Sequence, residues 1–238
     1  MSGDEFVLNS ALLAICYTYV LIIIFGAGKL HRVPILAKYS RKFLHIMIGN
    51  LVFIIPFFTF NLFPMNFPFF VAVPFILVTF LASPYSPLII SQKMKGLANI
   101  TERGHQTGLM FYALSYTVLA ALFSSKPYFI AIGILPMSFG DAFASIIGEK
   151  YGKKHYLFFA KKSLAGSLAM FLTSFLFVLG SLAVMSIFYP FSINNMLIVA
   201  IGVAIVATLA EACSPLGFDN ITVPSLSVLT AIVLLGGF

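Results

Sequence analysis

The sequence predicts an all-α integral membrane protein, and its composition is the first reason. Hydrophobic residues make up 61% of the 238 residues and charged residues only 9%. A soluble domain of this size carries roughly a quarter charged residues. The mean hydropathy is +1.05. A chain with so few charges must bury most of its surface in lipid, so we expect helices that cross a bilayer.

Runs of apolar residues predict the number of these helices. A span needs about 20 apolar residues, because a helix rises about 1.5 Å per residue through a hydrocarbon core about 30 Å thick. We find no linker, internal repeat or low-complexity tract, so we expect one polytopic membrane domain over residues 1–238. About eight spans are predicted, near residues 6–27, 43–60, 67–83, 108–124, 127–147, 164–189, 195–213 and 222–238.

Individual spans differ in regularity. No basic residue precedes the first apolar run, so we interpret it as a retained span rather than a cleaved signal peptide. Only residues 61–66 separate the second and third spans, which predicts a tight helical hairpin. The fifth span contains Asp141 and is therefore the least regular. The last span begins beside Pro224 and is short, which is typical of a tilted or partly re-entrant helix.

Basic residues predict the orientation. Five of the 14 Lys and Arg lie in residues 28–42, three in 84–107 and five in 148–163, which are loops of the same parity when eight spans are assumed. Only Lys126 lies in a loop on the opposite side. The side with the excess is cytoplasmic by the positive-inside rule, so both termini are expected on the non-cytoplasmic side.

Composition also argues against several functions. The net charge of +7 is spread over short loops, so the expected partners are membrane lipids and phosphorylated small molecules, not nucleic acid. Cys16 and Cys213 are far apart and form no CxxC pair, which indicates two buried small hydrophobes. The four histidines lack the spacing of a transition-metal site.

The segment 140–154 is the sharpest candidate site. Asp141 lies within an apolar helix, and an intramembrane carboxylate is a functional candidate because its burial is costly. Asp141, Ser145 and Gly148 share one helical face, which leads into a lysine-rich loop. A carboxylate for Mg²⁺, bare backbone amides and ammonium groups suit a polyphosphate, although small residues also serve helix packing. The candidate binding residues are Gly140, Ser145, Gly148, Gly152, Lys153 and Lys154.

Two predicted helix starts combine cations with backbone amides, which is the arrangement of a phosphate site. Arg41 and His45 are four residues apart at the start of the second span. Lys162 and Gly166 are four residues apart at the start of the sixth. Ordinary anchoring of helix ends is the alternative for both. The candidates are Arg41, Lys42 and His45 in the first cluster, and Lys162, Ser163 and Gly166 in the second.

The last cluster is acidic. Glu211 precedes Pro215 and Gly217, which end the helix and let the chain turn back. We expect that turn to bring Asp219 and Asn220 toward Glu211. Carboxylates converging near Asp141 would provide oxygen ligands for a divalent cation, so the predicted metal ligands are Asp141, Glu211 and Asp219.

Together these clusters resemble the CTP-dependent lipid-alcohol (polyprenol) kinases, a family that includes dolichol kinase and phytol kinase. Each motif is short, but their order and spacing cover most of the chain, from about residue 41 to 224. The matching segments are Arg-Lys-Phe-Leu-His at 41–45, Gly-Asp-Ala-Phe-Ala-Ser-Ile-Ile-Gly at 140–148, Tyr-Gly-Lys at 151–153, Lys-Ser at 162–163 with Gly-Ser at 166–167, and Glu211 with Asp-Asn at 219–220 and Pro224.

The resemblance implies that the γ-phosphoryl group of CTP is transferred to the hydroxyl of a membrane isoprenoid alcohol, with Mg²⁺, at the cytoplasmic face. It also implies that the 140–154 segment binds CTP and metal. Asp141 is then a metal ligand or base, and Lys153, Lys154 and Lys162 contact phosphates. Arg41 and His45 contact or orient the transferred group, and Glu211 and Asp219 complete the metal site or deprotonate the alcohol.

Other functions fit parts of the pattern. A cytidylyltransferase that forms a CDP-lipid needs the same membrane, nucleotide and acidic residues, but the Asp-Arg-Xaa-Asp-Ser type of signature is absent. A transporter of an anionic solute predicts inverted repeats with broken helices near the midplane. The polar groups here gather at one predicted face instead, which favours chemistry at the membrane surface.

Overall fold

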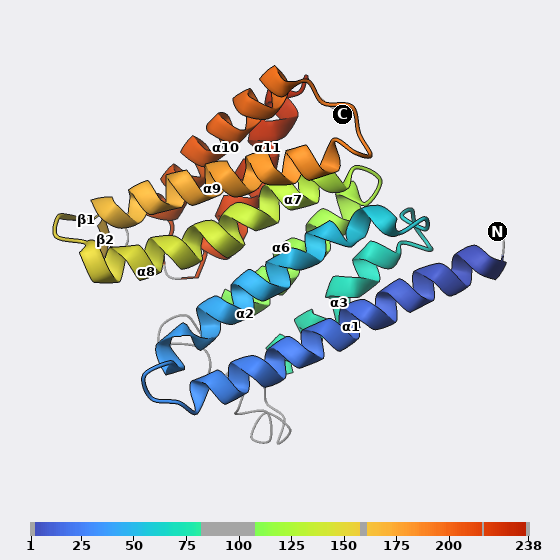
Figure 1. Ribbon diagram of the computed structural model, residues 1–238, viewed down its shortest axis with the longest axis horizontal. Helices are drawn as coiled ribbons and strands as arrows, with labels where there is room; N and C mark the ends of the chain where they lie inside the picture. Colours follow the sequence, from blue (N-terminus) through green and yellow to red (C-terminus); the bar gives the residue numbers. More distant parts are fainter. Residues whose placement is uncertain (1–2, 82–107, 158–160, 216, 237–238) are drawn as a thin grey trace. The chain divides into compact units, whose positions relative to one another are not determined.

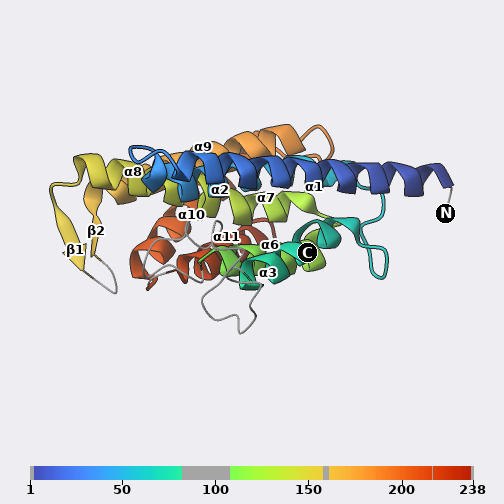
Figure 2. The same ribbon diagram turned by 90° about the horizontal axis from the view of Figure 1, so that it is seen from below.

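The computed structural model describes residues 3–81, 108–157, 161–215 and 217–236 (Figures 1 and 2). The chain divides into two compact units, Met1–Ser125 and Lys126–Phe238, and each is described by itself. The predicted single domain over residues 1–238 stays a prediction. The predicted basic loop over residues 84–107 lies outside the described residues.

The first unit is helical. Helix α1 packs on α2 and α3. Helix α3, the predicted third span, packs chiefly on α6 and α1. The main contacts of α3 are therefore not with the second span, with which it was expected to form a helical hairpin. Apolar residues of α1, α2 and α6 meet in its core, among them Ile23, Leu44 and Leu109. Its elements are α1 (Gly3–His31), η1 (Ala37–Tyr39), α2 (Ser40–Gly49), η2 (Asn50–Phe53), η3 (Ile55–Phe57), α3 (Phe67–Leu81) and α6 (Gly108–Phe123).

Two buried asparagines fix connections in this unit. Asn9 of α1 is fully buried, and its Oδ1 accepts hydrogen bonds from the backbone N–H groups of Thr59 and Phe60 at 3.1 and 3.2 Å. Asn66 accepts from the N–H of Phe69 at 3.0 Å and therefore caps the start of α3. Buried backbone groups need such partners, which explains polar side chains in apolar surroundings.

In the residues of the second unit that the structure describes, one short hairpin accompanies the helices. Figure 1 shows α8 and α9 running side by side, joined at one end by β1 and β2, and α9 also packs on α7 and α10. Ile130, Met170 and Val203 are fully buried in its core. Its elements are α7 (Pro127–Leu135), η4 (Pro136–Gly140), α8 (Asp141–Tyr151), β1 (His155–Leu157), β2 (Lys161–Ser163), α9 (Leu164–Met185), α10 (Ile193–Cys213) and α11 (Asp219–Leu234).

The irregularity expected in the fifth span is a π-helical turn, η4, between α7 and α8. Pro136 begins this turn and has no N–H to continue the α-helical bonding pattern. The helix therefore widens locally, and α8 begins at Asp141 immediately afterwards. Such turns are frequent at functional sites, so the candidate aspartate lies at a locally unusual stretch of backbone.

Within the described residues, five helical stretches are long and apolar enough to cross a membrane, which supports an integral membrane protein. They are Gly3–His31, Ala37–Phe57, Pro127–Tyr151, Leu164–Met185 and Ile193–Cys213. Three shorter apolar helices, α3, α6 and α11, coincide with the other predicted spans. The all-α class is therefore correct except for the hairpin β1–β2, while the count of eight spans and the location of the termini stay predictions.

Candidate active site

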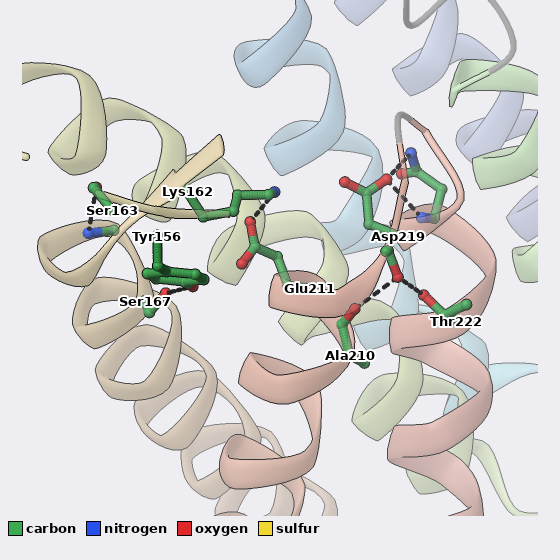
Figure 3. A network of polar contacts seen from close by, with 11 residues as sticks. Tyr156, Lys162, Ser163, Ser167, Ala210, Glu211, Asp219 and Thr222 are labelled. Carbon is green, nitrogen blue, oxygen red and sulfur yellow. Dashed lines mark hydrogen bonds and ion pairs between the residues drawn. The ribbon is translucent and has the colours of Figure 1, made fainter. Parts of the chain in front are cut away.

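An ion pair in the second unit joins two predicted site residues. The Lys162 ammonium of β2 donates to the Glu211 carboxylate in the last turn of α10 (Figure 3). The side chain of Glu211 is only 5% exposed and that of Lys162 is 23% exposed, so the pair is largely shielded from water. The structure thus brings together two residues that are 49 positions apart in the sequence.

Two further carboxylates act on the same ammonium. Burial lowers the pKa of Lys162, but Glu211 raises it, with further contributions from Asp141 and Asp219, and the net direction is upward. The four residues come from β2, α10, α8 and α11. Lys162 is therefore a protonated cation whose pKa is raised by three acidic residues, while the roles predicted for these residues stay predictions.

The hairpin β1–β2 explains how Lys162 reaches Glu211. Lys162 is paired with Tyr156 across the two strands, so both side chains lie on the same face of the hairpin. The Tyr156 hydroxyl lies 2.5 Å from the Ser167 hydroxyl of α9. This contact attaches the hairpin to α9, and Figure 3 shows Lys162 extending from the hairpin toward Glu211.

The chain turns back between α10 and α11, as the sequence predicted. Gly217 has φ +81°, a conformation that glycine adopts without a steric penalty. Ser214 donates to the Ala210 carbonyl at 2.6 Å and is also hydrogen-bonded to the Thr222 hydroxyl. The two helices are thereby connected through side chains beside Glu211 and the start of α11 (Figure 3).

Asp219 is the first residue of α11, so the prediction of a helix start beside Pro224 is wrong; Pro224 lies inside the helix. A carboxylate in the first turn complements the positive end of the helix dipole, which favours a start at Asp219. Its Oδ1 accepts from the backbone N–H and the side-chain amide of Asn220 at 2.9 and 3.1 Å. The Asn220 amide also donates to the Gly217 carbonyl, so it holds Asp219 against the turn.

The glycines of the 140–154 segment lie at close contacts between helices. A Cβ atom at Gly140 would come within 2.6 Å of Met170 and Ser174 on α9. A Cβ at Gly148 would lie 2.9 Å from the Ser163 hydroxyl, and one at Gly166 would lie 2.9 Å from the Ala144 carbonyl. The packing role that the sequence left open therefore applies to these glycines, and their contact with phosphate stays a prediction.

Ser163 also has a structural role. Its hydroxyl accepts from the Gly166 N–H at 3.1 Å and caps the start of α9. Near it, Gly152, Lys153 and Lys154 form the connection from α8 to β1, and both lysines are exposed. Ser145 is half-buried on α8, one turn after Asp141. The exposed lysines are accessible to a soluble anion, whereas the Ser163 hydroxyl is already used by the helix cap.

The acidic residues fit a divalent cation in charge but do not form a complete ligand set. Among the residues that the structure describes, no three His, Cys, Asp or Glu side chains are grouped so that they could hold a metal ion. Asp141, Glu211 and Asp219 carry three formal negative charges against one positive charge on Lys162, which leaves −2. Mg²⁺ is commonly held by one or two carboxylates together with waters and substrate phosphates, so these residues fit that kind of site.

The remaining predicted residues belong to the first unit. His45 of α2 is buried, its ring lies 4.7 Å from that of Tyr112, and the Tyr112 hydroxyl donates to the His45 carbonyl at 3.2 Å. Arg41 and Lys42 are half-buried one turn earlier. The backbone N–H groups of Tyr39 and Ser40, which precede Arg41, donate to the carbonyls of Leu36 and Ala37.

Sequence reasoning missed three hydroxyl residues that position this site, Tyr156, Ser214 and Thr222, and it noted Ser167 only as part of the Gly-Ser segment at 166–167. Tyr156 and Ser167 attach the hairpin to α9, and Ser214 and Thr222 connect α10 with α11. Each is an ordinary residue for its place in the sequence. The pairs form only after β1 and β2 pair and α10 and α11 pack, so no local signal marks them.

Comparisons with known proteins place the chain in a family. No family model matches the sequence, and no solved structure matches it. Phytol kinase of Synechocystis sp. is 33% identical over 221 residues, which cover 90% of this chain and 87% of the relative. A probable chloroplastic phytol kinase of Zea mays is 36% identical over 151 residues, 57% of this chain and 48% of that protein. Phytol kinase 1 of Arabidopsis thaliana is 28% identical over 211 residues, 83% of this chain and 66% of that protein. Because the similarity to the Synechocystis protein extends over most of both sequences, this chain belongs to the phytol kinase family.

Proposed function

We propose that this protein transfers the γ-phosphoryl group of CTP to the hydroxyl of a membrane isoprenoid alcohol of the phytol, geranylgeraniol or polyprenol (dolichol) type. Three relatives named as phytol kinases support an isoprenoid alcohol as the acceptor. The choice of CTP as donor rests on the resemblance of the motifs to CTP-dependent lipid-alcohol kinases.

One structural observation carries the proposal. Lys162 forms an ion pair with Glu211, and it also interacts electrostatically with Asp141 and Asp219. Phosphoryl transfer depends chiefly on positioning the reactants and neutralising charge that spreads over the phosphoryl oxygens. The Lys162 ammonium supplies positive charge for a phosphate, and a nearby carboxylate supplies a base. Both kinds of group therefore occur in the same part of the second unit.

The reaction balances with these groups. The alcohol oxygen attacks the γ-phosphorus, the bond from that phosphorus to the bridging oxygen of CTP breaks, and CDP leaves. The hydroxyl proton passes to a carboxylate, for which Asp141, Glu211 and Asp219 are the candidates. The products are the isoprenoid monophosphate and CDP, so no oxidant or further co-reactant is needed.

Mg²⁺ is the proposed cofactor, and Asp141, Glu211 and Asp219 are its proposed ligands, two at most at one time together with phosphate oxygens. When bound, it would neutralise charge on the nucleotide phosphates. Lys153 and Lys154 are exposed after α8 and are assigned to the nucleotide phosphates. Arg41 and His45 are assigned to the transferred group and Lys42 to the nucleotide phosphates, and Asn220 holds Asp219.

The proposed location of the chemistry is the cytoplasmic face of an eight-span protein. Support comes from the five long apolar helices, the three shorter ones and the asymmetric distribution of basic residues. A soluble nucleotide and a lipid hydroxyl can meet only at a membrane surface. Lys153 and Lys154, which follow α8, are exposed and suited to such a surface.

A direct assay tests the proposal. The purified protein in detergent with Mg²⁺ would receive γ-³²P-labelled CTP or ATP together with phytol, geranylgeraniol or a longer polyprenol. The variant Asp141→Asn removes the negative charge with little change in shape. The matched control Asp4→Asn makes the same change at an exposed residue in the first turn of α1.

Label in the lipid phase from CTP, lost in Asp141→Asn and kept in Asp4→Asn, is the expected result. Transfer of label from ATP alone would contradict the assignment of CTP as the donor, but it would still support a kinase function. Pyrophosphate release with phosphatidic acid, without labelled lipid, would replace the kinase with a cytidylyltransferase. No reaction of a folded protein with any donor or acceptor would contradict an enzymatic function of this kind.

A further inference from the structure

The first unit contains an apolar pocket enclosed by four helical segments. Its walls come from α1, from α2 with the turn η2, from α3 and from α6. The empty space between its walls, counted out to and including the open mouth, is about 550 Å³. Residues from three of these segments define it: Leu44, Ile48, Val71, Phe75, Tyr112 and Ala113.

The surface that lines this pocket consists almost entirely of carbon atoms, although threonine and tyrosine are among the lining residues. The Thr79 hydroxyl donates to the Phe75 carbonyl of its own helix at 2.6 Å. The Tyr112 hydroxyl donates to the His45 carbonyl. Tyr116 is 3% exposed, so its hydroxyl is buried as well. The Tyr116 hydroxyl has no hydrogen-bond partner among the described residues, but it exposes almost no surface. The described wall therefore presents almost only carbon to a ligand and suits a hydrocarbon chain.

The pocket also lies beside a predicted site residue. Tyr112 lines the pocket and packs its ring 4.7 Å from the ring of His45. Leu44, which lines the same pocket, directly precedes His45 in α2. Ile48 and Leu51 continue this wall at the spacing of one helical face, away from Arg41. A chain in the pocket would therefore have one end near His45, and the rest would extend along α2 away from Arg41.

We propose that this pocket binds the hydrocarbon chain of the isoprenoid alcohol and limits the length of chain that the enzyme accepts. The inference rests on the proposed function, because the family supplies the class of substrate. The inference adds where the hydrocarbon chain of the substrate binds and which residues limit its length. Ala113 of α6 and Ala72 of α3 are small lining residues, so larger side chains at either position would shorten the pocket.

The first experiment measures chain-length selectivity. Ala113→Leu and Ala72→Leu fill the pocket from two different helices. We expect the Michaelis constant for geranylgeraniol to rise about tenfold, the effect of withdrawing about two buried CH₂ groups from apolar contact. Activity with the shorter geraniol should stay within about twofold, because less of the pocket is needed, and it also reports that the variant is folded.

The matched control is Ala121→Leu, the same change on the same helix at a half-buried position that does not line the pocket. It should leave selectivity unchanged. If both pocket variants lose activity with short and long alcohols in equal proportion, or if neither variant changes selectivity, the pocket does not limit the length of the alcohol that the enzyme accepts. Thermal unfolding of each variant in detergent accompanies these assays, and the binding experiment below decides the matter for any variant that does not fold.

The second experiment detects binding without nucleotide. The wild-type protein in detergent is photolabelled with geranylgeraniol that carries a diazirine on its terminal isoprene unit, and the adducts are mapped by mass spectrometry. We expect adducts on α2, α3 and α6 residues of the pocket, displaced by excess phytol but not by excess phosphatidylcholine. Adducts only on lipid-exposed faces, or equal displacement by phosphatidylcholine, would show a nonspecific lipid crevice.

The two experiments separate the inference from the proposed function. Alcohol phosphorylation with no adduct in the pocket and no change in selectivity would reject the pocket as the isoprenoid site and would still support the kinase function. Specific, phytol-sensitive adducts in a protein that phosphorylates no alcohol would keep the pocket as an isoprenoid site and reject the kinase.

Discussion

Lys162 and Glu211 form an ion pair between strand β2 and helix α10, and this contact joins the hairpin to the end of a membrane helix (Figure 3). The pair connects the α8–α9 half of the second unit with the α10–α11 half. Because the ion pair is shielded from water, removing it should change both the stability and the activity of the protein, and the two effects can be measured separately.

Removing one member of the pair should destabilise the protein. Lys162→Met leaves the Glu211 carboxylate buried and unpaired, so we expect the free energy of unfolding to fall by about 3 kcal/mol. The double variant Lys162→Met with Glu211→Gln should recover most of that loss, because no buried charge remains, yet activity should stay lost. Thermal unfolding in detergent and the phosphoryl-transfer assay measure the two effects.

Lys126→Met is the control for this experiment, because Lys126 lies at the start of α7, away from the acidic cluster. It should change stability by less than about 0.5 kcal/mol and leave activity intact. Full activity in the double variant would contradict a role of the pair in phosphoryl transfer.

The hydrogen bond between Ser214 and Thr222 should matter for the position of Asp219. Thr222→Val keeps the shape of the side chain and removes the hydroxyl that connects α11 to Ser214. We expect a loss of about 1 kcal/mol in stability and a partial fall in kcat. Thr208→Val is the matched control on α10, because the Thr208 hydroxyl donates to the Ala204 carbonyl of its own helix and, among the described residues, connects to no other helix. Equal kcat values in the two variants would show that this contact does not position the site.

The close packing of α8 on α9 predicts a different outcome for two glycines of one helix. Gly166→Ala places a Cβ 2.9 Å from the Ala144 carbonyl, and backbone must move to admit it, so we expect a loss of about 1–3 kcal/mol. Gly180→Ala meets nothing within 4 Å and should leave stability unchanged or raise it by up to about 1 kcal/mol through helix propensity. Unfolding of both variants under the same detergent conditions compares them. Similar stability for the two would mean that α8 and α9 do not pack closely at Gly166.

The proposed orientation can be measured with single cysteines. In a background with Cys16→Ala and Cys213→Ala, the variants Ser125→Cys and Lys153→Cys each carry one exposed thiol. A membrane-impermeant maleimide should label Ser125→Cys in intact cells and Lys153→Cys only in inside-out vesicles. Labelling of both from the same side would contradict the assigned topology.

The apolar runs and the isolated charges of the sequence were sufficient for the class of protein and for most candidate residues. Long hydrophobic segments cannot be solvated by water, so their helical nature follows from composition. Asp141, Lys162 and Glu211 could be selected because a charge beside so many apolar residues is costly and needs a reason. The hairpin β1–β2 could not be predicted, because its strands, His-Tyr-Leu and Lys-Lys-Ser, have three residues each and are too short to show an alternating pattern.

Only the tertiary structure decided which of these residues meet. The partnership of Lys162 with Glu211 depends on how the hairpin is attached to α9 and how α10 packs on α9, and neither contact has a local sequence signal. The apolar pocket is the clearest case, since Leu, Ile and Phe at many positions are equivalent in a hydrophobic pattern. Which of them face one another is determined by the packing of whole helices, because hydrophobic attraction has no direction and shape complementarity selects the contacts.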